Sequence, residues 1–297
     1  MIILTDASDA EGIRCSDVGT NVDFQKYSKC SIEDSCVFID LHVMQDTKLN
    51  FDRVVHDFKC LIFEESSLHE IPSSIFITMK SNITHLFANG VGIAELSRFS
   101  FPFGQKLQSV DLSKNIIKVI KETVIYDAPN LELLNLSENR ISELSSNAFE
   151  KLSSLKTLDL SWNQITTIPF ELFQPLSGIV NLNLSHNRLQ IKFGMFPDAL
   201  VELDLSYNNI DIHHKFKIFS LMGNLKTLLL HGNRIENIHP SILESDLKFL
   251  GLSDNLFSCS ILADIFLTMR EKNVTSVPDA ENVVKNISNI QGIKCIE

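Results

Sequence analysis

Cysteine is the residue type with the clearest chemistry in this chain, and its distribution is uneven. Six cysteines occur among 297 residues, and they lie only towards the two ends: Cys15, Cys30, Cys36, Cys60, Cys259 and Cys295. An even number with terminal clustering predicts disulfide bonds formed in an oxidising compartment, because the CxxC pairs of a zinc site are absent. A set of buried reduced thiols is the alternative interpretation.

The four N-terminal cysteines permit three disulfide pairings. We predict Cys30–Cys36, because a short local loop closes at low entropic cost, and therefore Cys15–Cys60. An interleaved pairing is the alternative.

The other reactive side chains form no recognisable catalytic set. The chain has no GxSxG, no HExxH and no phosphate-binding glycine loop. His186 and His231 could share a face, but further metal ligands are lacking. Asp159 and Asp204 are separated by two copies of a sequence repeat of about 24 residues. Their carboxylates are therefore expected to be too far apart for joint acid–base catalysis. We therefore predict that the protein is not an enzyme and uses no cofactor or metal.

A repeat of about 24 residues organises the middle of the chain. Its frame, seen in residues 131–141 (LELLNLSENRI), has apolar residues at positions one, four, six and eleven and Asn at position nine. Nine copies begin at Phe58, Ile83, Leu107, Leu131, Leu155, Ile179, Leu200, Leu225 and Leu247. Seven copies carry the asparagine: Asn115, Asn139, Asn163, Asn187, Asn208, Asn233 and Asn255. The first two copies have Ser66 and Val91 in its place.

The frame predicts a short strand whose fourth and sixth side chains point inward, while the third, fifth and seventh face the other side. The asparagine amide can satisfy backbone groups in the turn that follows. One copy buries too little apolar surface to offset the ordering of its backbone, so stacked copies with capped ends are required.

The period and pattern resemble the leucine-rich repeat family. The resemblance implies an α/β fold, a curved solenoid with a parallel sheet on its concave face and disulfide-bonded caps at both ends. We divide the chain into an N-terminal segment and cysteine cap (1–57), nine repeats (58–258) and a C-terminal cap (259–297). The N-terminal cap is predicted to form a hairpin within residues 27–43, with an apolar strand at Val37–Val43. The C-terminal cap is predicted to contain a helix from about Ser260 to Lys272 and a Cys259–Cys295 bridge.

Two frame positions carry candidate binding residues. Position five is polar and partly acidic in the middle of the array, and position eight holds three consecutive aromatic residues, including the only Trp of the chain. Aromatic side chains with a polar edge are favoured at protein interfaces, although packing against the turn of the next repeat is the alternative. We predict partner contacts at Asp111, Asp159, Trp162, His186, Asp204 and Tyr207.

Charge and sequons indicate the environment of the protein. A net charge of −11 argues against nucleic acid as the main partner. No apolar run is long enough for a membrane span. Asn-x-Ser/Thr sequons fit an extracellular protein, and we predict glycosylation at Asn82, Asn273 and Asn286. The sequons at Asn135 and Asn183 also arise from the consensus sequence of the repeat, because Asn-Leu-Ser fits its frame.

The ends of the array resemble one group of repeat proteins. The N-terminal CVFIDLHV and FKCLIFEESSLHEIPSSIF and the C-terminal NISNIQGIKC are similar to the leucine-rich immune proteins of insects, including mosquitoes. That resemblance implies secretion and a partner that is another repeat protein or a complement-like defence protein. The predicted function is non-catalytic recognition or scaffolding in innate immunity. The alternative is the ectodomain of a leucine-rich repeat membrane receptor or adhesion protein.

Overall fold

The computed structural model describes most of the repeat array and parts of both ends. The described residues are 2–3, 30, 35–39, 41–43, 58–78, 82–97, 100–126, 128–190, 196–211, 222–239, 242–243, 246–278, 289–290 and 293–296. They belong to two units, Met1–Leu158 and Asp159–Glu297.

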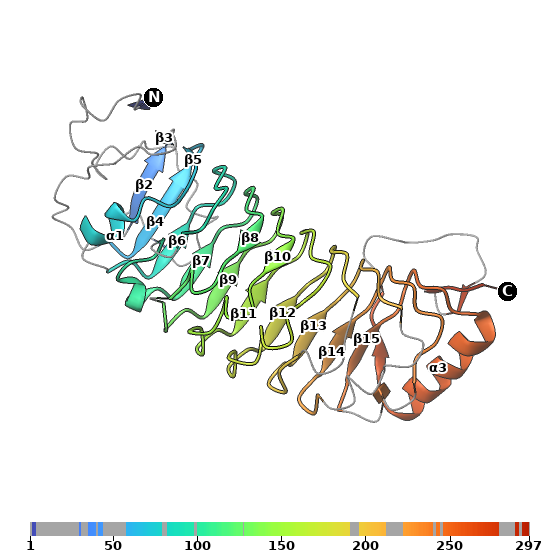
Figure 1. Cartoon of the computed structure of the whole chain (residues 1–297). Helices are drawn as coiled ribbons and strands as arrows, with labels where there is room; N and C mark the ends of the chain where they lie inside the picture. The colour runs from blue at the N-terminus through green and yellow to red at the C-terminus, as the bar shows by residue number, and fades with distance from the viewer. Residues whose placement is uncertain are drawn as a thin grey trace. The chain divides into compact units, whose positions relative to one another are not determined.

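The first unit is built on a run of parallel strands that follows the repeat frame (Figure 1). In spatial order these are β2 (Ser35–Ile39), β4 (Cys60–Glu64), β6 (His85–Phe87), β7 (Ser109–Asp111) and β9 (Leu133–Asn135). Their register pairs equal frame positions, so that Leu86 lies beside Val110 and Val110 beside Leu134. All three side chains are fully buried, which confirms that position four points into the core.

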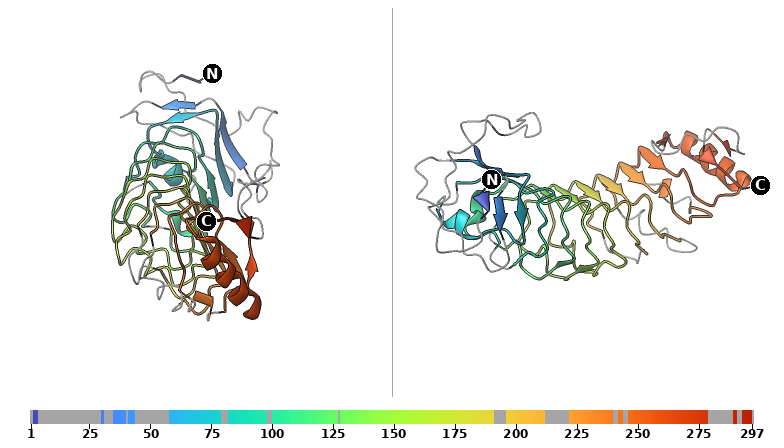
Figure 2. Two further views of the ribbon diagram at one scale, coloured as in Figure 1. Left: turned by 90° about the vertical axis from the view of Figure 1, so that its right-hand side faces the viewer. Right: turned by 90° about the horizontal axis from the view of Figure 1, so that it is seen from above.

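The second unit repeats the arrangement with strands lying side by side (Figure 2). They are β12 (Asn181–Asn183), β13 (Glu202–Asp204), β14 (Thr227–Leu229), β15 (Phe249–Gly251) and β16 (Thr275–Ser276). A further strand, β11 (Thr157–Asp159), contains the boundary between the units. The predicted parallel-sheet solenoid is therefore confirmed.

Smaller elements connect the strands. β1 (Ile2–Ile3), β3 (Leu41–Val43) and β5 (Ser67–Leu68) form a parallel sheet, and β8 (Val119–Ile120) pairs in parallel with β10 (Glu143–Leu144). Two short helices are α1 (Ser74–Thr78) and a 3₁₀ turn, η2 (Gly104–Lys106). The strands are brief because each repeat must turn and return within about 24 residues.

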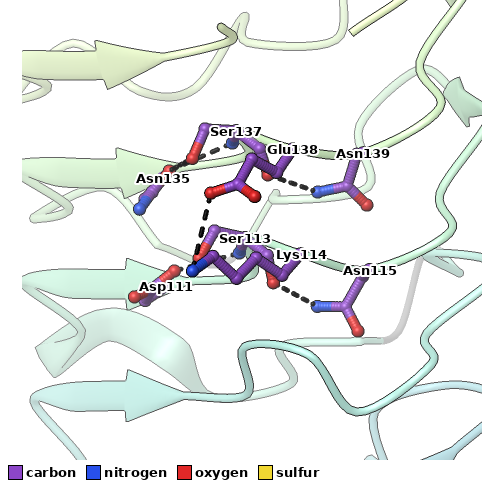
Figure 3. A network of polar contacts seen from close by, with 8 residues as sticks. All are labelled: Asp111, Ser113, Lys114, Asn115, Asn135, Ser137, Glu138 and Asn139. Carbon is purple, nitrogen blue, oxygen red and sulfur yellow. Dashed lines mark hydrogen bonds and ion pairs between the residues drawn. The ribbon is translucent and has the colours of Figure 1, made fainter. Parts of the chain in front are cut away.

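The position-nine asparagines tie each repeat to the one before it. Asn139 is buried, and its Oδ1 accepts the backbone N–H of Ile117 at 3.1 Å. Its Nδ2 donates to three carbonyl oxygens at 2.9–3.1 Å, those of Leu112, Leu136 and Ser137. Figure 3 shows this asparagine in line with its counterpart in the preceding repeat. The amide thus satisfies backbone groups that the turn would otherwise leave buried and unpaired.

Ser66 performs the same task in the first repeat, where the asparagine is missing. Its Oγ accepts the N–H of Leu41 at 3.1 Å and lies 2.8 Å from the carbonyl oxygen of Glu64 and 3.4 Å from that of Phe38. These partners occupy the frame positions that the asparagines contact elsewhere. The departure from the consensus therefore leaves the geometry of the first repeat intact.

The predicted apolar strand Val37–Val43 of the N-terminal cap is divided into β2 and β3, and each of them pairs in parallel with a strand of the first repeat. The other arm of the predicted hairpin, residues 27–34, lies outside the described residues except for Cys30. The cap residues follow the same frame as the first repeat, 25 positions earlier in the sequence. Cys36 therefore lies beside Leu61, and Phe38 lies beside Phe63. The cap therefore covers the apolar end of the array by adding one more strand to the sheet.

The predicted N-terminal disulfides are wrong, because Cys30 bonds to Cys60 with 6.0 Å between the Cα atoms. The parallel register places Ser35 directly beside Cys60, so the chain entering β2 lies next to that residue. Cys36 is fully buried in the strand and is itself disulfide-bonded. The short loop between Cys30 and Cys36 favoured their pairing. That prediction did not take into account that Cys36 lies within β2. Cys15 lies outside the described residues.

The C-terminal cap contains the predicted helix, α3 (Cys259–Glu271). Ser258 is its N-cap, and the side-chain oxygen accepts the N–H of Ile261 at 3.3 Å. One face of the helix is buried and covers the core, through Leu262, Ile265, Phe266 and Met269.

A second disulfide and a small hairpin complete this cap. The predicted Cys259–Cys295 bridge is confirmed, with 4.9 Å between the Cα atoms. Next to it, β17 (Asn289–Ile290) and β18 (Ile293–Lys294) pair antiparallel. The bridge joins the first residue of α3 to the end of this hairpin.

Candidate functional site

The turn after each strand passes through a residue in the left-handed backbone region. This residue is position eight of the frame, and its φ lies between 48° and 69° in all nine repeats: Glu65, Gly90, Lys114, Glu138, Trp162, His186, Tyr207, Gly232 and Asp254. Left-handed conformation costs an ordinary L-residue roughly 1–2 kcal/mol, whereas glycine adopts it freely. The bulky residues at Trp162, His186 and Tyr207 therefore hold an unfavourable backbone conformation.

Hydrogen bonds to the next repeat hold these three residues in place. The backbone N–H of Trp162 donates to the carbonyl oxygen of Ser185 at 3.0 Å, and that of His186 donates to Ser206 at 2.9 Å. The N–H of Tyr207 donates to the carbonyl oxygen of His231 at 2.6 Å. The turn geometry is thus fixed by the backbone and not by the identity of the side chain.

The three aromatic rings stack on one another. The ring centroids of Trp162 and His186 are 3.7 Å apart with planes 9° from parallel, and those of His186 and Tyr207 are 4.5 Å apart at 15°. Trp162 is 54% exposed, while the other two side chains are half-buried. We call Trp162, His186 and Tyr207 the aromatic row.

Stability alone does not account for the aromatic row. Two ring pairs contribute about 0.5–1.5 kcal/mol each beyond area burial. Three left-handed backbones cost roughly 1–2 kcal/mol each, and Trp162 remains largely exposed. Exposed aromatic residues on a fixed turn are typical of a contact surface.

Position eight carries charge in the first unit. Lys114 and Glu138 lie in consecutive repeats and form an exposed ion pair with 3.6 Å between Nζ and Oε1 (Figure 3). Neighbouring side chains at this position therefore contact each other whether they are charged or aromatic. An exposed pair of this kind contributes about 0–1 kcal/mol.

The acidic residues predicted as contacts also have a structural role. Asp159 and Asp204, at position five, each accept a backbone N–H at 2.8 Å, from Ser161 and Ser206. Asp111 accepts the N–H of its own serine in the same way but belongs to the first unit (Figure 3). All three carboxylates are only half-buried, so they also contribute negative charge to the sheet surface.

The structure brings three of the six predicted contact residues into one cluster, the aromatic row. Asp159 and Asp204 lie on the strand side of the same unit, and Asp111 lies on β7. The left-handed turn was not predicted from the sequence. The two glycines at position eight, Gly90 and Gly232, were the available signal for it.

Within the described ranges, no group of three or more His, Cys, Asp or Glu side chains is arranged to hold a metal ion. None of the helices in that part of the chain has the length and apolar character needed to span a bilayer.

Comparison with family models identifies the repeats. Residues 105–165, 130–189 and 153–210 match the model described as Leucine rich repeat, and residues 224–245 match a second model of that description. No curated protein sequence matches the chain.

Solved structures with the same fold come from several sources. The mosquito APL1 leucine-rich repeat domain has a TM-score of 0.64 and 24% identity over 75% of this chain, which spans 64% of the APL1 chain. The LRIM1/APL1C complex gives 0.57 and 18%, covering 88% of this chain and 69% of that one. Human 5T4, a trophoblast glycoprotein, gives 0.56 and 21%, covering 69% and 80%. At these identities the likeness establishes the fold.

Proposed function

We propose that this leucine-rich repeat protein is a non-catalytic, secreted recognition protein of innate immunity that binds other proteins through its repeat surface. The observation that carries the proposal is the aromatic row, which combines an exposed indole with two stacked rings on a backbone held by hydrogen bonds. Such preorganised aromatic surfaces lose little conformational entropy on binding.

The surroundings of the aromatic row define the partner that would fit it. Arg188 and Arg234 are exposed at position ten of their repeats, two residues after His186 and Gly232, whereas Glu202, Asp159 and Asp204 occupy the strand side. A matching partner would place an apolar or aromatic group on the row and a basic side chain over the strand side. Such charge matching acts mainly on specificity and on the rate of association.

The similarity to mosquito structures supports the choice of host defence. The LRIM1/APL1C structure is a complex of two proteins, and the ends of our chain resemble insect leucine-rich immune proteins. By analogy, the proposed partner is another repeat protein or a complement-like defence protein. Disulfide bonds at both ends of the array support an extracellular location.

The alternative function is that of a membrane receptor or adhesion ectodomain, and similarity to the human trophoblast glycoprotein 5T4 is compatible with it. The two functions differ in where the native protein is found. Immunoblotting of cell-free body fluid and of washed membranes distinguishes them. Protein recovered only with membranes would favour the alternative.

A capture experiment tests the proposed function. Immobilised wild-type protein and the double variant Trp162→Ala/Tyr207→Ala are exposed to the same body fluid, and each captured protein is quantified. Buried aromatic anchors typically cost ~2 kcal/mol or more on truncation, so a true partner should bind the double variant at least about tenfold more weakly. Equal capture by a variant that still folds would move the contact to another surface.

A further inference from the structure

Tyr207 is the last ring of the aromatic row. Its ring lies against Gly232, the position-eight residue of the next repeat. A Cβ atom built on Gly232 would lie 2.3 Å from Cδ1 and 2.5 Å from Cε1 of Tyr207. Such approaches are far shorter than van der Waals contact. The ring therefore occupies the space that a side chain at Gly232 would need.

Two features favour glycine at position 232, the adjacent Tyr207 ring and the backbone conformation, and their effects can be separated. The φ of Gly232 is +59°, a conformation that disfavours any side chain. Gly90 shares this feature, with φ +69° at the same frame position, but a Cβ there would meet nothing closer than Lys114 at 3.9 Å. The two glycines differ in whether a neighbouring ring fills the Cβ space.

We propose that Gly232 is a positioning residue for partner recognition, an inference that rests on the proposed function. Tyr207 lies flat because Gly232 leaves it room, His186 stacks on Tyr207, and Trp162 stacks on His186. The recognition element is then one unit spread over four consecutive repeats. A side chain at Gly232 displaces Tyr207 and disturbs the stack up to the exposed indole.

The test compares Gly232→Ala with the matched control Gly90→Ala. Both variants place alanine in a left-handed turn, so the backbone strain is common to them. Trp162 is the only tryptophan of the chain, so its fluorescence and near-UV circular dichroism report on the stack. We expect Gly232→Ala to change both signals, to lower Tm by about 2–4 °C more than the control and to weaken partner binding about tenfold. Gly90→Ala should leave the signals and the binding as in the wild type.

The outcomes distinguish the inference from the proposed function. Trp162 signals that are unchanged in Gly232→Ala would overturn the role of Gly232 without touching the proposed function, which Trp162 variants test directly. Changed signals with unchanged partner binding would confirm that Gly232 positions the stack and would contradict the stack as the partner site.

A third variant keeps the test decisive if Gly232→Ala folds poorly. In a Tyr207→Ala background the ring is gone, so Gly232→Ala should lower Tm no more than Gly90→Ala does. An equal extra loss with and without the Tyr207 ring would show that the ring is not the cause, and the inference would fail.

Discussion

The imidazole of His186 lies flat on the indole of Trp162, with 3.7 Å between the ring centroids and 9° between the planes. The two residues are 24 positions apart in the sequence, so this contact forms only when consecutive repeats stack in register. This ring contact is therefore part of the proposed contact surface. Its presence also indicates that the repeats of the second unit are stacked in register.

The position-nine asparagines, which we call the asparagine ladder, should contribute strongly to the stability of the first unit. Asn139→Ala removes the acceptor of the buried N–H of Ile117 and one donor to each of the carbonyl oxygens of Leu112, Leu136 and Ser137. At ~1–3 kcal/mol for each unsatisfied group, the free energy of unfolding should fall by at least about 3 kcal/mol. Urea denaturation measures this loss. Arg140→Ala, at the exposed neighbouring position, should change stability by no more than about 0.5 kcal/mol.

Serine should partly replace asparagine in the ladder, because Ser66 does so in the first repeat. Asn139→Ser should therefore cost less unfolding free energy than Asn139→Ala under the same urea conditions. Equal losses for the two variants would show that the hydroxyl at this site does not take over the amide contacts.

His231 should make Gly251 irreplaceable. A Cβ on Gly251 would lie 2.2 Å from Nε2 of His231, whose Nδ1 accepts the N–H of Ser253 at 3.1 Å. Gly251→Ala must displace a buried ring and break this bond, which should cost about 2–4 kcal/mol of unfolding free energy. Gly223→Ala is the control, because a Cβ there meets nothing within 4 Å. Similar stabilities of the two variants in thermal unfolding would contradict the packing of His231.

The C-terminal bridge should hold α3 on the end of the core. Cys259 and Cys295 are 36 residues apart, and closing a loop of this length stabilises the folded state by ~4 kcal/mol in the chain-entropy model. Cys295→Ser should therefore lower Tm, and Cys259→Ser should lower it by a similar amount. Peptide mapping under non-reducing conditions checks the pairing. A free Cys259 in the wild type would refute it.

Glycosylation should avoid the sheet. Asn135 and Asn183 lie in strands, and the Oδ1 of each accepts both the N–H and the O–H of the serine in its own sequon. Asn273 is exposed directly after α3, Asn82 precedes β6, and Asn286 lies outside the described residues. Mass spectrometry of protein from secreting cells should find glycans at Asn82, Asn273 and Asn286. Heavy occupancy of both strand sites would mean that ligands use another face.

The repeat frame predicted the fold because it records burial directly. Leu134 and Leu158 are fully buried, as their frame position requires, and Asn139 makes the predicted turn contacts. The N-terminal cap was predicted wrongly because its copy of the frame is degenerate, with Cys36 and Leu41 in the leucine and asparagine positions. Loop length then suggested a local disulfide between Cys30 and Cys36.

The candidate site was predicted in its residues but not in its geometry. Spacing placed Trp162, His186 and Tyr207 at one frame position, which is enough to expect them in a line. Their stacking depends on the left-handed turn and on the absence of a side chain at Gly232, and neither follows from the apolar pattern. Packing and partner contact were treated as alternative interpretations of these residues. The structure is compatible with both, since the rings pack on one another and Trp162 still remains exposed.

The most direct test of the account is the dissociation constant of the captured partner for Trp162→Asn against Glu138→Asn. Both residues occupy position eight with φ of 53° and 52°, and asparagine accepts this conformation more readily than either, so both variants should fold. Loss of the indole should weaken binding by at least about tenfold, whereas Glu138→Asn should leave it unchanged. Equal dissociation constants for the two folded variants would contradict the aromatic row as the recognition surface.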